Sequence, residues 1–313
     1  MKIFLIGKKG TKCDQNYERF RTNLAKVHDV IFYGEGYWPN YNWKKFIPDI
    51  LSSLNEKPDI ILVHAPVGRI KQPIEKNNSL YGFNEVNIPK IHVIGDYLCG
   101  GSLEKMYDSY LKYYKFDLIF ISVPKDIITL KRKNLAPAVH LLPFSVDTSI
   151  FFDMGLDRSI DVMASFSKGE WYANRKQLLR KLIAMNLNLF YDKICHEDYV
   201  KTINKSKIFV CGNNINNNIS AKYNEVLACN TLFIVDKPDE LEELGYENGK
   251  HLVIYENLED MQEKVLYYLK HEEERKQIAQ QGMKFVRENY SNQKMVKRFT
   301  EIVQKEFVIR EVL

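Results

Sequence analysis

Short apolar segments alternate with amphipathic helical segments along most of the chain, and this alternation constrains the fold more than any other feature. Strands that alternate with helices form parallel sheets, because each helix returns the chain to the edge where the next strand begins. We expect strands at Lys2–Ile6, Asp29–Tyr33, Ile60–His64, Lys90–Ile94, Leu118–Ser122 and His140–Leu142, and then at Asp161–Phe166, Leu187–Tyr191, Ile208–Cys211, Leu232–Asp236 and Leu252–Tyr255. One sheet could hold them all, but 313 residues favour two sheets of similar size.

Composition and charge exclude several classes of protein. The 45 basic and 40 acidic residues are interspersed, so the formal charge of +5 falls short of a nucleic-acid footprint and suits anionic small substrates or weak attraction to anionic lipid. The longest apolar runs are too short to span a bilayer. The five scattered cysteines are Cys13, Cys99, Cys195, Cys211 and Cys229. An odd set without a Cys-x-x-Cys pair, together with no cleavage site after Met1–Ile6, predicts reduced thiols in a cytoplasmic protein.

The segment Ser220–Asp236 carries the most chemical information. Ser220 is a good N-cap for a helix, and that helix leads into an apolar strand. Lys222 and Glu225 are three residues apart, so they share one helix face. A helix N-terminus with a lysine in its first turn suits a phosphate group, and a glutamate one turn later can bind sugar hydroxyls. Taken alone, the segment fits a surface helix with a Lys–Glu ion pair at least as well.

The order Lys222-x-x-Glu225, then Leu227–Cys229, then an apolar strand resembles the donor-binding segment of GT-B glycosyltransferases. Asn230 stands where these enzymes usually have glycine. The stretch Glu240–Gly282 resembles the C-terminal half of the spore-maturation (CgeB-type) and glycosyl transferases group 1 family. The resemblance implies an α/β protein of GT-B architecture, with two Rossmann-like parallel-sheet domains facing a cleft and a C-terminal helix that crosses back to the first domain.

The resemblance also implies a domain organisation. The segment Pro143–Phe152 resembles the linker phrase that closes the first domain of these enzymes. We therefore expect an acceptor-side domain over residues 1–150, a nucleotide-sugar-binding domain over 151–292, and a terminal helix over 293–313 that packs on the first domain.

Donor contacts are expected from two loops of the second domain, because ligands of open α/β sheets bind beyond the carboxyl ends of the strands. The resemblance implies that Lys222 neutralises a diphosphate and that Glu225 binds the ribose hydroxyls, with the aromatic Tyr223 beside them. The loop and helix start after Asp161–Phe166 imply further diphosphate contacts. These candidates are Ser167, Lys168 and Arg175. Arg175 could instead pair with an acidic side chain at the helix start.

Catalytic candidates in the first domain are less sharply defined. Asp96 follows the strand Lys90–Ile94, where relatives often carry an aspartate, and a carboxylate there could take a proton from an acceptor hydroxyl. Helix capping explains Asp96 about as well. His64 ends another strand and is a weaker candidate. The aromatic loop Gly34–Trp43 could recognise a sugar or pack on its own domain. Asn217 stands where many retaining relatives have a second glutamate, which leaves the stereochemical outcome open.

The sequence and its resemblance thus predict a glycosyltransferase of hexosyltransferase type, in the cytoplasm or at the inner face of the membrane. It would move a sugar from a nucleotide-diphosphate donor to a glycan, lipid-linked or protein acceptor. Lys222 would serve both binding and catalysis. We see no metal-ligand cluster and no Asp-x-Asp pair, so we expect no metal and no cofactor besides the donor. The alternatives are a nucleotide-sugar epimerase and a non-catalytic surface or spore assembly protein that kept the fold.

Overall fold

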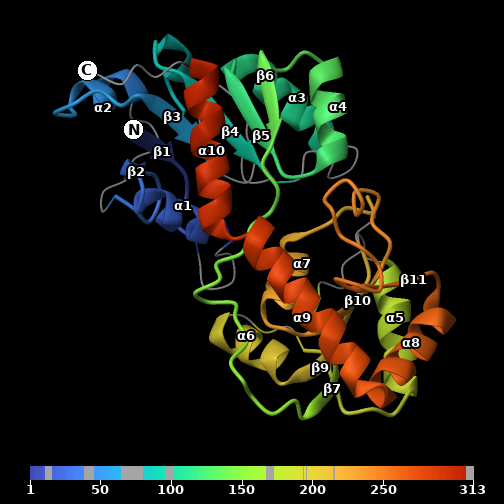
Figure 1. The fold of residues 1–313 in the computed structure, drawn as a ribbon. Coiled ribbons are helices and arrows are strands. Elements are labelled where there is room, and N and C mark those ends of the chain that lie inside the picture. The colour runs from blue at the N-terminus through green and yellow to red at the C-terminus, as the bar shows by residue number, and fades with distance from the viewer. Residues whose placement is uncertain are drawn as a thin grey trace. The chain divides into compact units, whose positions relative to one another are not determined.

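The computed structural model describes residues 1–10, 16–38, 46–64, 80–95, 102–166, 173–192, 194, 196–213 and 216–307. The chain forms two compact units (Figure 1). Unit 1 consists of Met1–Pro143 together with Met295–Leu313, and unit 2 of Phe144–Lys294. Within the described residues, no helix is both long enough and apolar enough to cross a bilayer.

Unit 1 is built on a parallel six-stranded sheet with the strand order β2-β1-β3-β4-β5-β6. Its strands are β1 Lys2–Ile6, β2 Asp29–Tyr33, β3 Ile60–Val63, β4 Lys90–Ile94, β5 Leu118–Ile121 and β6 Ala138–Leu141. Its helices are α1 Asn16–Ala25, α2 Ile47–Ser52, the 3₁₀ helix η2 Phe83–Glu85, α3 Ser102–Tyr114 and α4 Pro124–Arg132. The strands are apolar on both faces, as expected for a sheet covered on both sides.

The terminal helix α10, Asn292–Phe307, belongs mostly to unit 1. Its apolar face packs on one side of the sheet, where Phe299 is fully buried and contacts Phe20 of α1 and Phe120 of β5. His140 of β6 also contacts Glu306, with 2.7 Å between Nε2 and Oε1. The prediction that the terminal helix returns to the first domain is therefore confirmed.

Unit 2 is built on a parallel five-stranded sheet with the order β11-β10-β9-β7-β8. Its strands are β7 Ile160–Met163, β8 Leu189–Phe190, β9 Ser206–Cys211, β10 Leu232–Asp236 and β11 Val253–Tyr255. Its helices are α5 Ala173–Ala184, α6 His196–Asn204, α7 Ala221–Ala228, α8 Leu258–Lys270 and α9 Glu272–Asn289. The prediction of two Rossmann-like parallel sheets is confirmed.

A glycine sets how closely α9 approaches the rest of unit 2. A Cβ on Gly282 would collide with the carbonyl oxygen of His251 and would lie 2.9 Å from Leu227 of α7. Close packing of α9 therefore requires a residue without a side chain at this position. This contact fixes α7, the helix that carries Lys222 and Glu225, against the body of unit 2.

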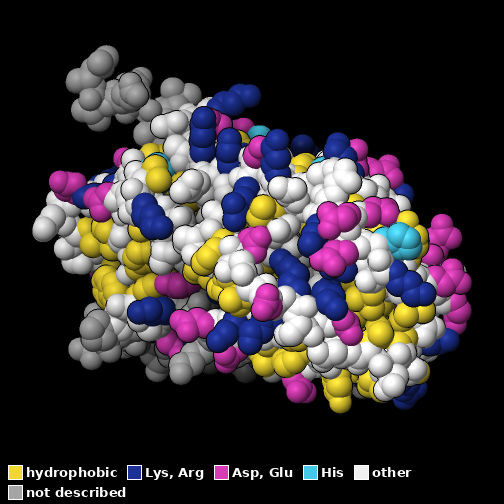
Figure 2. Space-filling model, turned by 60° about the horizontal axis from the view of Figure 1, so that its bottom comes forward, with side chains coloured by type: hydrophobic (Ala, Val, Ile, Leu, Met, Phe, Trp, Pro, Cys, Tyr) yellow, Lys and Arg dark blue, Asp and Glu magenta, His cyan; other side chains and the backbone are white. Residues whose placement is uncertain are grey.

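The charged surface is mixed in sign. Figure 2 shows Lys and Arg side chains interspersed with Asp and Glu over the face in view. No large field of one sign dominates this face, so it offers no extended basic track for a nucleic acid.

Candidate functional site

Helix α7 begins without a side-chain cap from its N-cap residue. Ser220 occupies the N-cap position with an extended backbone, φ −132° and ψ 166°, but its side chain makes no capping hydrogen bond. The predicted hydroxyl cap is therefore wrong, although the predicted helix start is right. Uncapped amides at a helix start attract anions, because their N–H groups point outward and the helix dipole is positive there.

Lys222 lies in the first turn of α7 and is held by neutral oxygen atoms. Its Nζ donates to the carbonyl oxygen of Ser165, at 3.0 Å, and to the Tyr199 hydroxyl, at 3.2 Å. The ammonium also lies over the rings of Tyr199 and Phe209, at 5.1 and 5.4 Å from their centroids. Among the described residues Lys222 has no ion-pair partner, so the Lys222–Glu225 ion pair that the sequence left open is not formed.

Glu225 follows one turn later on the same helix and is only 8% exposed. Tyr199 of α6 connects it electrostatically to Lys222. Burial raises the pKa of Tyr199 well above its usual value, and the charge of Glu225 and hydrogen bonding to it raise this pKa further. Tyr199 therefore keeps its proton, so its hydroxyl can accept from Lys222 and donate toward Glu225. The three side chains form one polar group at the start of α7.

Arg175 comes from α5 and converges on the same end of the sheet. Its Nε donates to the carbonyl oxygen of Gly212, directly after β9, at 2.6 Å, and its guanidinium lies 5.6 Å from the ring centroid of Phe166. The side chain is 8% exposed. Because Ser165 and Phe166 follow β7 and Gly212 follows β9, Arg175 and Lys222 both reach the carboxyl ends of these neighbouring strands. This is the position expected of anion-binding residues.

The loop after β9 is held by an amide network that sequence reasoning missed. The backbone N–H of Asn213 donates to Oδ1 of Asp236, at 2.7 Å, and its side-chain amide donates to Oδ1 of Asn217, also at 2.7 Å. The Asn217 amide in turn donates to Asp239, at 2.7 Å. Asn217 has a left-handed backbone, φ 54°, which asparagine tolerates well. Asn217 thus organises the loop.

Asp236 ends β10 and is the titratable group of this network. Burial raises its pKa to about 6, against the opposing effects of the Asn213 N–H and the Arg175 charge. Near neutral pH the carboxylate is therefore partly protonated. Its ionisation changes the charge that Arg175 experiences, and with it the positive potential at the site.

Tyr223 does not line this site. Its side chain is 2% exposed and packs edge-on against Phe233 and Tyr246, with ring centroids 4.8 and 6.1 Å away. Its hydroxyl donates to Oδ1 of Asn213 at 2.9 Å. The geometry corrects the predicted donor contact of Tyr223: the side chain packs in the core and supports the loop after β9 from beneath.

The carboxyl end of the sheet in unit 1 is organised around a buried arginine. Arg21 is 1% exposed and donates to the carbonyl oxygens of Lys8, at 2.6 Å, and of His64, and to the Tyr37 hydroxyl, at 3.1 Å. Glu18 completes the group, 3.4 Å from Arg21 and hydrogen-bonded to Tyr37. One guanidinium therefore ties together the loops that follow β1, β2 and β3.

His64 is 3% exposed and neutral. Burial, followed by the charge of Arg21 and the neighbouring His92, lowers its pKa well below the usual value. Its ring packs edge-on against Phe20 at 5.4 Å. The part of the aromatic loop that the structure describes packs on its own unit, with Tyr37 stacked on Phe32 at 4.8 Å.

The remaining predicted site residues, Asp96, Ser167 and Lys168, lie outside the described residues, as does Trp43. Within the described part of the chain, no three or more His, Cys, Asp or Glu side chains are grouped as metal ligands. Cys211 and Cys229 are buried free thiols, and burial raises the pKa of Cys229 to about 12, so neither behaves as a reactive thiolate.

Comparison with known proteins places the fold and part of the sequence among known ones. Residues 169–301 match a family model described as glycosyl transferase-like. HepE of Anabaena, solved with UDP and glucose, has a TM-score of 0.68 at 10% identity, over 97% of this chain and 100% of that one. A glycosyltransferase of Rickettsia africae has 0.63 at 14%, over 99% of each chain. A protein of Listeria monocytogenes described as a UDP-N-acetylglucosamine 2-epimerase has 0.59 at 12%, over 99% and 98%. No curated protein matches the sequence.

These findings define the class of the protein: it has the GT-B fold over nearly its whole length. Residues 169–301, which cover most of the second unit, resemble the glycosyl transferase-like family, as the sequence resemblance indicated.

Proposed function

We propose that the chain transfers a hexose from a nucleotide-diphosphate sugar, bound by unit 2, to an acceptor that is a glycan or a molecule carrying one. Support comes from the glycosyl transferase-like family match and from similarity to a structure solved with UDP and glucose. The single observation that carries the proposal is the state of Lys222. Its ammonium is partly buried at an uncapped helix start and is satisfied only by neutral groups in the described structure.

A diphosphate would displace the weaker carbonyl and hydroxyl contacts of Lys222, because charge-assisted hydrogen bonds are roughly twice as strong as neutral ones. The first amides of α7 would add N–H donors to the same phosphate. As the bond between the sugar and the diphosphate breaks, negative charge builds on the leaving phosphate. Lys222 stabilises that charge without reorganisation, since it is already held in place.

Arg175 and Glu225 would complete the donor site. The Arg175 guanidinium uses Nε for Gly212, and its terminal nitrogens would face the second phosphate. Glu225, which accepts a hydrogen bond from the protonated Tyr199, would also accept hydrogen bonds from the ribose hydroxyls. Ser167 and Lys168 remain proposed diphosphate contacts. Asp96 remains our candidate for the base that deprotonates the acceptor hydroxyl, with the neutral His64 as the weaker candidate.

An epimerase is the second candidate, favoured by the similarity to the Listeria protein described as a UDP-N-acetylglucosamine 2-epimerase. Transfer differs from epimerisation in its need for an acceptor. An epimerase converts the nucleotide sugar alone, whereas a transferase releases the nucleoside diphosphate and joins the sugar to a second molecule.

We propose a cytoplasmic location with weak contact to an anionic membrane surface and no nucleic-acid partner.

A panel of nucleotide sugars, with UDP-glucose first, tests the proposal by thermal shift, because a ligand that binds the native state raises its melting temperature. We expect one donor class to stabilise the protein. That donor, incubated with glycan acceptors, should yield nucleoside diphosphate and a glycosylated product. Conversion of the donor to an epimer without an acceptor would establish the second candidate instead, and no shift with any nucleotide sugar would contradict both.

A further inference from the structure

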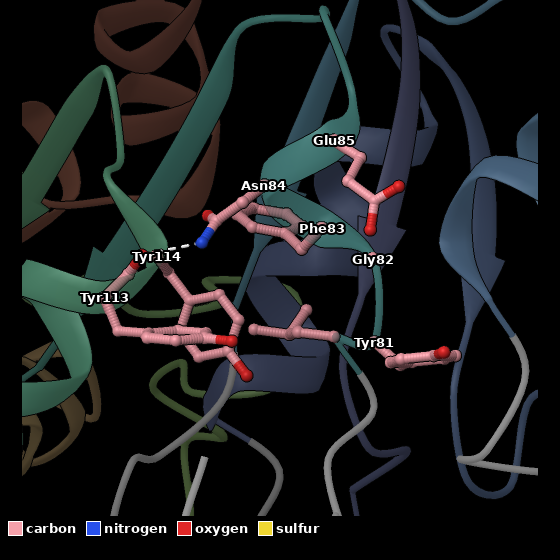
Figure 3. A pocket seen from close by; sticks show the side chains of 8 residues that line it. Tyr81, Gly82, Phe83, Asn84, Glu85, Tyr113 and Tyr114 are labelled. Atoms are coloured by element: carbon pink, nitrogen blue, oxygen red, sulfur yellow. Dashed lines mark hydrogen bonds between the residues drawn. The ribbon is translucent and has the colours of Figure 1, made fainter. Parts of the chain in front are cut away.

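A hollow of about 240 Å³ opens on unit 1, and none of its lining residues belongs to the proposed donor site (Figure 3). It is lined by Leu80, Tyr81, Gly82, Phe83, Asn84, Glu85, Tyr113 and Tyr114. Figure 3 shows Tyr113 and Tyr114 on one side, Tyr81 on the other and Phe83 between them. A volume slightly below the usual ~300–1,000 Å³ of pockets for drug-sized ligands fits a single ring-sized unit.

The floor of the hollow is rigid and aromatic. Phe83 is 1% exposed and lies between Tyr114, at 5.7 Å, and Phe116, at 5.4 Å, measured between ring centroids. The Asn84 amide donates to the carbonyl oxygen of Tyr113 at 2.7 Å and so joins η2 to the end of α3. The two sides of the hollow are thus fixed relative to each other before any ligand binds, which lowers the entropy cost of binding.

The rim is polar, and its groups are available. Tyr81 is 55% exposed and Tyr113 42% exposed, and Glu85 is exposed. In the part of the chain that the structure describes, neither tyrosine hydroxyl nor the Glu85 carboxylate has a protein partner. Gly82 makes the turn that presents Tyr81: its backbone is left-handed, φ 77°, and a Cβ there would collide with the ring of Phe46.

From this geometry we infer that the hollow binds one unit of a neutral glycan, as a second carbohydrate site on the protein. A sugar ring has an apolar C–H face and a rim of hydroxyl groups, which match the exposed rings of Tyr81 and Tyr113 and the acceptor Glu85. An anionic ligand is disfavoured by the Glu85 charge. An aliphatic chain would bury that charge without a partner, at considerable cost.

The position of the hollow determines the length of the glycan. Asn84 lies a few residues before the start of β4, and Tyr114 lies a few residues before the start of β5. The hollow is therefore at the edge of the sheet where these strands begin. The loops tied by Arg21 lie where strands end. A five-residue strand such as β4 separates these edges by roughly 16 Å, so no single sugar reaches both. The inference rests on the proposed function, because it takes the ligand of the hollow to be part of the acceptor. The acceptor would be a polymer, with one sugar unit in the hollow and its growing end at the edge of the sheet where the strands end.

The test is a printed glycan array probed with the full-length protein without any donor, beside Tyr113→Ala, Tyr81→Ala and Glu85→Gln. The control is Tyr267→Ala, which removes a comparably exposed tyrosine of α8, 44% exposed, far from the hollow in sequence. We expect the wild type to bind a defined set of glycans and the two tyrosine variants to lose about tenfold in apparent affinity, as expected for one lost aromatic contact. The control should bind as the wild type does.

Unchanged array binding in all three variants, or no glycan binding by the wild type, would overturn the inference. A peptide library that yields a ligand lost in Tyr113→Ala would overturn it as well and assign the hollow to a protein partner. Melting temperature and UDP affinity are measured in parallel. Both should be preserved in the variants, because the side chains removed are exposed. Failure of every nucleotide sugar of the panel to bind the wild type would contradict the proposed function and leave the array result standing.

Discussion

The carboxyl ends of the two sheets both place a partly or fully buried cation among loops, but the two cations differ in their partners. Arg21 of unit 1 is 1% exposed and is satisfied by two carbonyl oxygens, a tyrosine hydroxyl and Glu18. Lys222 of unit 2 has a carbonyl oxygen and a hydroxyl and, among the described residues, no carboxylate. The charge of Arg21 is paired directly with Glu18, whereas the charge of Lys222 has no direct carboxylate partner among the described residues and can pair with a ligand.

The comparison shows how a structural cation is told from a ligand-binding one. Burial alone does not separate structural from ligand-binding cations, since Arg175 at the donor site is likewise buried, at 8% exposed. The difference lies in whether the positive charge is compensated within the protein, because an uncompensated cation near the surface gains most from a bound anion. The predictions below challenge this distinction, from the largest expected effect to the smallest.

Removal of the structural cation should cost the most stability. Arg21→Ala leaves Glu18 without its positive partner and the carbonyl oxygens of Lys8 and His64 without their donor, and breaking a buried pair in this way costs about 3–5 kcal/mol. Urea unfolding should show this loss, while UDP affinity, measured below the lowered transition, should stay as in the wild type. Lys26→Ala, at the exposed end of the same helix region, is the control and should unfold normally. A decrease in the free energy of unfolding of less than about 1 kcal/mol would contradict this, because it would show that Arg21 contributes no more than an exposed ion pair does.

Removal of the proposed ribose contact should weaken ligand binding. Hydrogen bonds to a charged group contribute about 1.5–3 kcal/mol, so Glu225→Ala should lower UDP affinity roughly tenfold to hundredfold. Glu225→Gln keeps the size of this buried side chain and guards against a folding defect. The second arm uses 2′-deoxy-UDP. The wild type should bind it more weakly than UDP, whereas the variant should hardly distinguish the two. Equal binding of both nucleotides by the wild type would place Glu225 outside the ribose site.

The charge of Asp236 should make the donor site pH-dependent. Its pKa is raised from 3.8 to about 6, so the native state holds more protons than the unfolded state between these values, and stability falls as pH rises through this window. Asp236→Asn removes the charge and can keep the bond from the Asn213 N–H. The variant should therefore gain stability on the order of 2 kcal/mol at pH 8 and little at pH 4.

The same variant should bind UDP more tightly than the wild type at pH 8, because a negative charge near Arg175 is gone. At pH 5 the two proteins should bind alike, since most of the wild-type carboxyl is then protonated. Calorimetric titration at the two pH values measures the ratio of the UDP dissociation constants of the wild type and the variant. An unchanged ratio would show that Asp236 does not sense the ligand.

The smallest effect is expected at Tyr223. Tyr223→Phe keeps the ring packed between Phe233 and Tyr246 and removes only the hydroxyl that donates to Asn213. The free energy of unfolding should fall by about 1 kcal/mol, with UDP affinity nearly unchanged. A large loss of UDP affinity in Tyr223→Phe at an unchanged melting temperature would contradict this, and would support the direct contact between Tyr223 and the donor that the sequence suggested.

Much of the fold could be predicted from the sequence because the strands are continuous apolar runs. Leu232–Asp236 and Lys90–Ile94 were predicted with their observed bounds, and parallel sheets follow from the alternation with helices. The positions of Lys222 and Glu225 on one helix face also followed, since helical periodicity is local information. Helical periodicity also explains why the assignment of Tyr223 to the site was wrong. Tyr223 follows Lys222 directly, and a step of one residue turns a side chain about 100° around the helix, here from the site into the core.

The partners of the site residues could not be predicted. Tyr199 and Ser165 meet Lys222 because α6 and the end of β7 pack beside β9, and neither residue lies in a recognisable motif. Arg21 is a helix residue with nothing local to mark it as buried. Ser220 has the expected backbone conformation but not the expected side-chain bond. Each of these contacts joins segments far apart in sequence or depends on a rotamer, and both are set by tertiary packing.

The central claim is that the uncompensated charge of Lys222 holds a nucleoside diphosphate. Calorimetric titration of UDP into the wild type and Lys222→Ala, at low and at high salt, tests it directly, with Lys201→Ala of the neighbouring α6 as the exposed control. We predict that Lys222→Ala loses roughly tenfold or more in UDP affinity at low salt. High salt should reduce the difference in affinity between the wild type and Lys222→Ala, because it screens the charge of Lys222. The control should bind UDP as the wild type does. Equal affinity of the wild type and Lys222→Ala at both salt concentrations would contradict the claim and return Lys222 to a purely structural role.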